Sequence, residues 1–150
     1  MTKSVSVLNE LLIELFNDIL IIEQNTLKDG KFKDISITEI HTIEAIGMYK
    51  SRTMSEIAQD LNITVGTLTI AINNLVRKGY AVRERSEKDR RVVMVSLTRK
   101  GKLAYRLHEK FHSDMIKYTI EGLNETEEAI LINSLEKLNN YLKQKYNLKD

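Results

Sequence analysis

Two histidines stand four residues apart in the C-terminal part of the chain, at His108 and His112. In a helix this spacing puts both imidazoles on one face, where their ring nitrogens can bind zinc together. Glu23 and His41 fall on other expected helices and would offer two more ligands. The same side chains can instead form hydrogen bonds in a core or an interface, and we favour that structural role over a metal site.

Other kinds of reactive chemistry are missing from the sequence. Cysteine is absent, which excludes disulfides, thiol redox sensing and cysteine-based metal sites. We find no glycine-rich phosphate loop and no Ser-His-Asp motif, so we expect neither an enzyme nor a cofactor. Every apolar run is shorter than a membrane span and the N-terminus lacks a signal-peptide pattern, so we expect a cytoplasmic protein with no membrane partner.

Positive charge is concentrated in one part of the sequence. Residues 77–110 contain twelve lysines and arginines but only four acidic residues, although the net charge of the whole chain is +2. The remainder of the chain is therefore acidic. A basic surface of this kind is typical of contact with phosphates, and a solvated charged surface is the alternative.

Capping residues indicate where the helices begin. Ser36, Thr53 and Asn124 are each followed three residues later by glutamate, and Thr64 is suited to capping a further helix. The sequence thus predicts short helices over 36–48, 53–61 and 64–78, and a tight turn joins the last two. Strands are expected near 80–85 and 92–97, on either side of a charged loop. This order is that of a helix-turn-helix followed by a β-wing.

The helix over 64–78 has two unlike faces. Leu68, Ala71, Ile72 and Leu75 recur at helical spacing and are expected to face the core. The other face is polar except for Ile70, which a thymine methyl would match, and asparagine suits adenine in the major groove. The DNA contacts expected from this helix are Thr64, Gly66, Thr67, Thr69, Ile70, Asn73, Asn74 and Arg77.

The charged loop between the strands is expected to be a second DNA contact. Lys88, Arg90 and Arg91 at the tip of a ribbon would reach an adjacent minor groove. Asp89 lies two positions before Arg91 and would accept from its guanidinium group, which gives it a role in shaping the wing. A winged helix that binds protein instead of DNA would have an apolar reading face and a neutral wing, unlike this one.

Long amphipathic helices flank this central region, at about 5–27, 98–121 and 124–145. The first is apolar over so wide an arc that it needs two partners, and one of these is expected to be a second subunit. Packing within one chain is the alternative. We therefore expect a mainly α fold with a small two- or three-stranded β-wing, in which a winged helix-turn-helix over about 36–98 lies between dimerisation helices. Residues 1–150 would form a single domain.

The wing also carries a recognisable motif. Asp89, Arg91, Leu97, Thr98 and Gly101 match the pattern DxRxxxxxLTxxG, and the chain resembles the MarR family of bacterial regulators. The resemblance implies a homodimer with interleaved terminal helices and two winged-helix lobes on double-stranded DNA. Zinc-sensing members of that family use a similar histidine and glutamate arrangement.

Four further segments, 32–37, 41–43, 75–80 and 106–112, look like the FabT-type repressors of fatty-acid synthesis in Gram-positive cocci. That resemblance implies an A·T-rich palindromic operator and a corepressor consisting of an acyl chain on acyl carrier protein. A zinc-responsive or other small-molecule-responsive repressor is the alternative. An acyl channel would be lined by the first helix with Ile43, Ile46 and Met48, and an acidic carrier would dock on Arg99, Lys100, Lys102 and Arg106.

Overall fold

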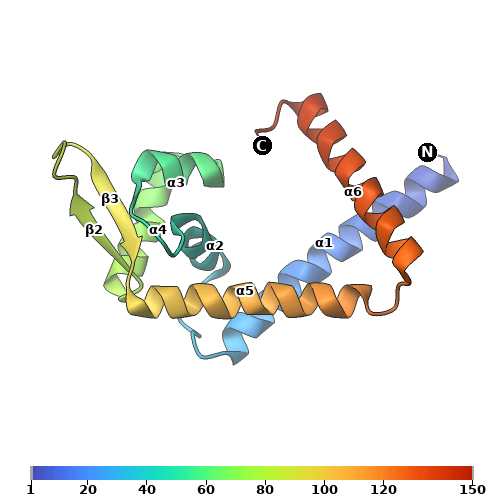
Figure 1. The fold of residues 1–150 in the computed structure, drawn as a ribbon, viewed down its shortest axis with the longest axis horizontal. Helices are drawn as coiled ribbons and strands as arrows, with labels where there is room; N and C mark the ends of the chain where they lie inside the picture. The colour runs from blue at the N-terminus through green and yellow to red at the C-terminus, as the bar shows by residue number, and fades with distance from the viewer. Residues whose placement is uncertain (1, 150) are drawn as a thin grey trace. The chain divides into compact units, whose positions relative to one another are not determined.

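The structure is a computed structural model that describes residues 2–149. Its elements are α1 (Lys3–Asp29), α2 (Ile37–Ile46), β1 (Arg52–Thr53), α3 (Met54–Leu61), α4 (Val65–Arg77), β2 (Ala81–Arg85), β3 (Val93–Leu97), α5 (Arg99–Ile120) and α6 (Glu125–Tyr146) (Figure 1). The predicted fold class, mainly helical with a small β-wing, is confirmed. The chain divides into two compact units, Met1–His108 and Glu109–Asp150, which we describe separately. The prediction of one domain over residues 1–150 stays a prediction.

The helices begin at the capping residues that the sequence indicates. The Ser36 hydroxyl accepts from the Glu39 amide at 3.1 Å, and the Glu39 carboxylate accepts from the Ser36 amide at 3.2 Å. Thr53, Thr64 and Asn124 likewise accept from the amide three residues ahead. The helix expected over 36–48 ends two residues early, because Gly47 has a φ of 77° and leaves the helical conformation.

The wing contains three antiparallel strands in the order β1-β3-β2. β2 pairs with β3 along its whole length, from Ala81 opposite Leu97 to Arg85 opposite Val93. The two-residue strand β1 pairs with the other side of β3 and leads directly into α3. The sequence-based expectation of two or three strands is thus resolved as three.

The core of the first unit lies between α2, α3, α4 and the inner side of the sheet. The four apolar residues expected to face inward from α4 are all buried there. Ile43 and Ile46 belong to the same core, with 0% and 1% of their surface exposed. Neighbouring core side chains cover both isoleucines, and the expectation that they line an acyl channel stays a prediction.

A close backbone contact joins the turn after α4 to the start of α5. The Thr98 hydroxyl donates to the Gly79 carbonyl at 2.6 Å and accepts from the Gly101 amide at 3.1 Å, while the Thr98 amide donates to the Tyr80 carbonyl at 3.0 Å. A Cβ at Gly101 would lie 2.0 Å from the Tyr80 carbonyl oxygen. The Thr-x-x-Gly part of the wing motif therefore has a structural cause, since only glycine permits this approach.

Polar contacts also fix the C-terminal end of α4. The Lys78 ammonium group donates to both carboxylate oxygens of Glu39 at 2.9 Å and to the Asp34 carbonyl. The Tyr80 hydroxyl donates to the Asp34 carboxylate at 2.5 Å. Burial, followed by this hydrogen bond, raises the pKa of Tyr80 above its usual value. These bonds hold the end of α4 against the segment that leads into α2.

Apolar surface is left uncovered on the long helices. Leu8, Leu11, Leu15 and Phe16 on α1 are each more than half exposed, and Phe16 reaches 66%. In the second unit, none of the described residues of α6 is buried, although the helix carries several leucines. Among residues 2–149, no helix has the length and apolar character needed to cross a membrane.

Candidate nucleic-acid interface

The helix α4 presents its polar face to solvent, opposite the buried face described above. Ile70 lies on this polar face and is 66% exposed. Thr69 and Asn74 are half-buried, and the other residues expected to contact DNA from this helix are exposed. All eight expected contact residues are thus accessible to a ligand that binds this face of α4.

The threonines of α4 also make local hydrogen bonds that the sequence reasoning did not assign. Thr64 caps the helix by accepting from the Thr67 amide at 3.1 Å, and the two hydroxyl oxygens lie 3.0 Å apart. The Thr69 hydroxyl donates to the Val65 carbonyl at 2.8 Å. Because its hydrogen is already used, the Thr69 oxygen is suited to accept a hydrogen bond from a base amino group.

Both asparagines of the exposed face are held by arginines. The Asn73 side-chain oxygen accepts from Arg83 on β2, and the Asn74 side-chain oxygen accepts from Arg77 at 3.1 Å. Arg83 was missed by the sequence reasoning. Strand periodicity could have found it, because Arg83 shares a strand face with Ala81, which is buried against the core.

The tip of the wing is ordered by a carboxylate. The Asp89 side chain accepts from Arg91 three times: from the backbone amide and Nε at 3.1 Å, and from Nη2 at 3.3 Å. These bonds lower the pKa of Asp89. Two backbone bonds close the loop below them, from the Ser86 amide to the Val92 carbonyl and from the Val92 amide to the Asp89 carbonyl. The Arg91 side chain remains 91% exposed.

A further arginine supports the loop at the tip of the wing. Arg85 on β2 donates to the Arg90 carbonyl at 2.7 Å, and this residue also went unnoticed in the sequence. Lys88 and Arg90, the other expected contacts of the loop, are both exposed. The loop therefore offers cationic side chains on a backbone that is fixed by hydrogen bonds.

A groove of about 640 Å³ lies between the wing and the first turns of α3 and α4. Hydroxyl groups and guanidinium groups occur together in its wall, a combination that suits a phosphodiester backbone. Its lining residues are Thr53, Met54, Ser55, Val65, Thr69, Arg83, Glu84, Arg85, Arg91, Val92 and Val93.

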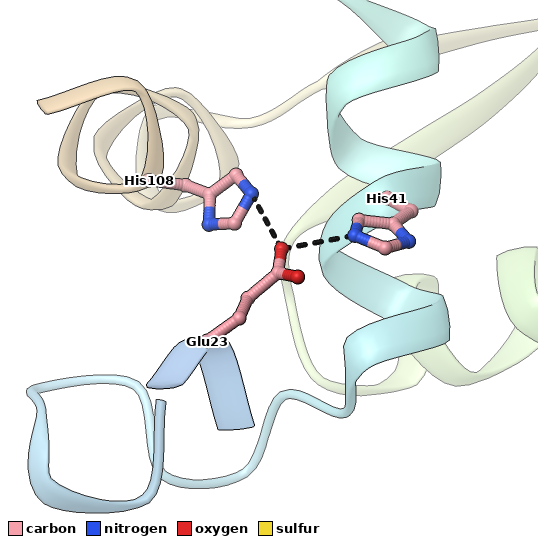
Figure 2. A group of neighbouring side chains, drawn as sticks. All are labelled: Glu23, His41 and His108. Atoms are coloured by element: carbon pink, nitrogen blue, oxygen red, sulfur yellow. Dashed lines mark hydrogen bonds and ion pairs between the residues drawn. The ribbon is translucent and has the colours of Figure 1, made fainter. Parts of the chain in front are cut away.

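Three of the four candidate zinc ligands meet inside the first unit (Figure 2). One carboxylate oxygen of Glu23 lies 2.9 Å from Nε2 of His41 and 3.1 Å from Nε2 of His108. Glu23 and His108 are buried, with 3% and 4% of their surface exposed. Glu44 approaches the same nitrogen of His108 at 2.8 Å. His112 lies one turn further along α5, in the second unit.

The chemistry of this group fits two uses. Two imidazoles and a carboxylate are ligands that zinc accepts. The three ligand atoms lie within 4.8 Å of one another, and tetrahedral ligands at zinc distances lie about 3.3 Å apart. Without a metal, the buried Glu23 carboxylate is satisfied by accepting hydrogen bonds from the two histidines. The cluster also joins α1, α2 and α5, since each of these helices contributes to it.

The chain is similar in sequence and fold to a known DNA-binding protein. The MarR family pattern matches residues 33–92. A solved structure of Streptococcus pneumoniae FabT in complex with DNA is 45% identical to the chain, with a TM-score of 0.89 over 93% of this chain and 98% of that one. A MarR family protein from Bacillus stearothermophilus shares the fold, at 17% identity and a TM-score of 0.79 over 95% of this chain and 98% of that one.

A curated relative carries the same class of function. The uncharacterized HTH-type transcriptional regulator YkoM of Bacillus subtilis is 28% identical over 116 residues, which are 77% of this chain and 75% of the relative. The expectation that the chain is not an enzyme is confirmed, because these relatives are regulators. The exposed face of α4, the basic wing and the 45% identity to FabT lead to one conclusion. The chain belongs to the MarR family and is a DNA-binding transcriptional regulator.

Proposed function

We propose that the chain is a cytoplasmic homodimer that represses fatty-acid-synthesis genes, and that acyl chains on acyl carrier protein strengthen its binding to an A·T-rich palindromic operator. The observation that carries the proposal is the 45% identity to FabT across nearly the whole of both chains. The exposed polar face of α4 and the ordered basic wing would supply the two DNA contacts that such a repressor needs.

The uncovered apolar surfaces support the dimer. A helix with no buried residue, such as α6, gains too little from packing on its own chain to explain its leucines. Covering these side chains with a second copy would bury them at about 25 cal/mol per Å². Two copies would also supply the two reading helices that a palindrome requires.

The basic residues of α5 support an acidic acyl carrier protein as the partner that delivers the acyl chain. Arg99 and Arg106 on α5 are exposed, whereas Lys100 is partly used within the fold, because its ammonium group lies 4.3 Å from the centre of the Tyr80 ring. With Ile43 and Ile46 in the core, the apolar face of α1 is the surface left for an acyl chain.

Operator binding with and without the effector tests this function. Fluorescence anisotropy of a labelled A·T-rich palindromic duplex would be measured at two salt concentrations, with long-chain acyl carrier protein and with the unacylated carrier as control. We expect the acylated carrier to lower the Kd and the unacylated carrier to leave it unchanged. Equal Kd values in both arms would refute the effector but leave the family and its DNA binding intact.

A zinc-responsive repressor is the second candidate, and the meeting of Glu23, His41 and His108 favours it. Calorimetric titration of chelator-treated protein with zinc should then show binding at micromolar metal, and His41→Ala should abolish it. The absence of heat in the unsubstituted protein would eliminate zinc and leave the cluster as a hydrogen-bonded core.

A further inference from the structure

The hydrogen bond between Arg83 and Asn73 joins the wing to the reading helix. Arg83 pairs with Val95 in the sheet and lies on the same strand face as Ala81. Val95 and Ala81 are both buried. Its guanidinium group therefore leaves the core side of the sheet next to α4, where it donates to the Asn73 side chain. Asn73 itself is exposed on the reading face.

The chemistry of the two groups fixes which end of the Asn73 amide faces outward. A guanidinium group can only donate, so the amide must turn its oxygen towards Arg83. The opposite orientation would place two donors against each other. The Nδ2 group, with two hydrogens, is therefore the end left for a ligand. Asn74 shows the same arrangement, because its oxygen accepts from Arg77.

This orientation changes what Asn73 can recognise. An asparagine reads adenine by donating to N7 while its oxygen accepts from the N6 amino group. An oxygen that already accepts from Arg83 is a weaker acceptor for that amino group. Guanine and thymine present only acceptors in the major groove, whereas adenine and cytosine each present an amino donor.

We propose that Arg83 is a positioning residue that determines specificity: by occupying the Asn73 side-chain oxygen, it makes Asn73 a donor to the major groove, so that the base contacted by Asn73 is preferentially guanine or thymine. This proposal depends on DNA binding alone. It is independent of the effector and of the identity of the regulated genes.

Base preference at a single operator position tests the proposal. Duplexes selected from a random pool by the unsubstituted protein give the operator, and the position at which Asn73→Ala loses its preference identifies the contacted base pair. Kd values are then measured for all four base pairs at that position. We expect Arg83→Met to shift the preference towards adenine by about 5-fold or more. Arg83 is exposed, so the variant should fold.

Arg85→Met is the matched control. It removes the same charge from the same strand face two residues away, but the Arg85 guanidinium group donates to the Arg90 carbonyl, whereas that of Arg83 donates to Asn73 of α4. It should weaken binding to all four base pairs by one common factor. Arg83→Lys keeps a long side chain that can only donate, so its base preference should stay near that of the unsubstituted protein.

Two results would overturn the proposal. One is an unchanged base preference in Arg83→Met, with all four Kd values raised equally as in Arg85→Met. The other is a shift towards adenine that persists when Arg83→Met is combined with Asn73→Ala, because the effect would then not pass through Asn73.

Discussion

Replacing Gly101 with alanine tests the contact between the start of α5 and the turn after α4. The added Cβ would lie 2.0 Å from the carbonyl oxygen of Tyr80 and 3.1 Å from its carbonyl carbon. Both are backbone atoms, so no side chain can rotate away. Since Cβ atoms essentially never approach closer than 3.0 Å, the two segments must separate by about 1 Å.

The cost can be estimated from what this separation breaks. Forcing an extra methyl group into a packed site costs about 1–3 kcal/mol. The Thr98 bonds to the Gly79 and Tyr80 carbonyls span the same contact, and each is worth about 1 kcal/mol. With one of them lost, we expect Gly101→Ala to lower the free energy of unfolding by about 2–4 kcal/mol.

Urea denaturation followed by circular dichroism measures this loss, at one fixed protein concentration because association affects the midpoint. Gly66→Ala is the control. Gly66 also lies in the first turn of a helix, but its added Cβ would meet only the Thr64 hydroxyl, at 3.9 Å. It should be neutral or stabilising by up to about 1 kcal/mol. Equal midpoints for the two variants would refute the reasoning about the contact.

Three further predictions concern the wing and the buried tyrosine. Arg90→Ala should weaken binding to every duplex and reduce the slope of log Kd against log salt by about one phosphate contact, whereas an unchanged slope would remove Arg90 from the DNA contacts. Because Arg91 lowers the pKa of Asp89, the hydrogen bonds between the two side chains should persist as the pH falls below the usual pKa of aspartate. They should break only when the pH reaches the lowered pKa. The Arg91 Nε–H resonance should follow that titration, and Asp89→Asn should shift it at neutral pH. Because the pKa of Tyr80 is raised, its neutral form stabilises the fold below pH 10, and this contribution should be lost as pH rises from about 10 towards the raised value. Urea melts across that range should show a smaller decline in Tyr80→Phe; an equal decline would contradict the assignment.

Local features of the fold were predictable from the sequence. The starts of α2, α3, α4 and α6 follow from capping bonds between residues three apart, which depend little on the rest of the chain. The buried face of α4 follows from helical periodicity, because only one side of a short helix can face a core.

Contacts between distant segments were not predictable in this way. Ile43 and Ile46 have the same apolar character whether they line a channel or a core, and only the packing of α3 and α4 around them decides. Arg83 is one of many charged residues in its region, and its partner lies on another element. The burial of Glu23 depends on two helices that meet it from later in the chain.

The attachments of α4 constrain how an effector would control DNA binding. The helix is held at its start by the Thr64 cap, at its end by the Lys78–Glu39 ion pair, and at its side by Arg83. Because α4 is held at three places, its internal geometry resists change, whereas the helix can still move as a rigid body. The helix α5 begins at the Gly101 contact beside the end of α4 and continues into the second unit. We therefore expect regulation to act on the spacing of two reading helices in a dimer and to leave the base preference of each helix unchanged.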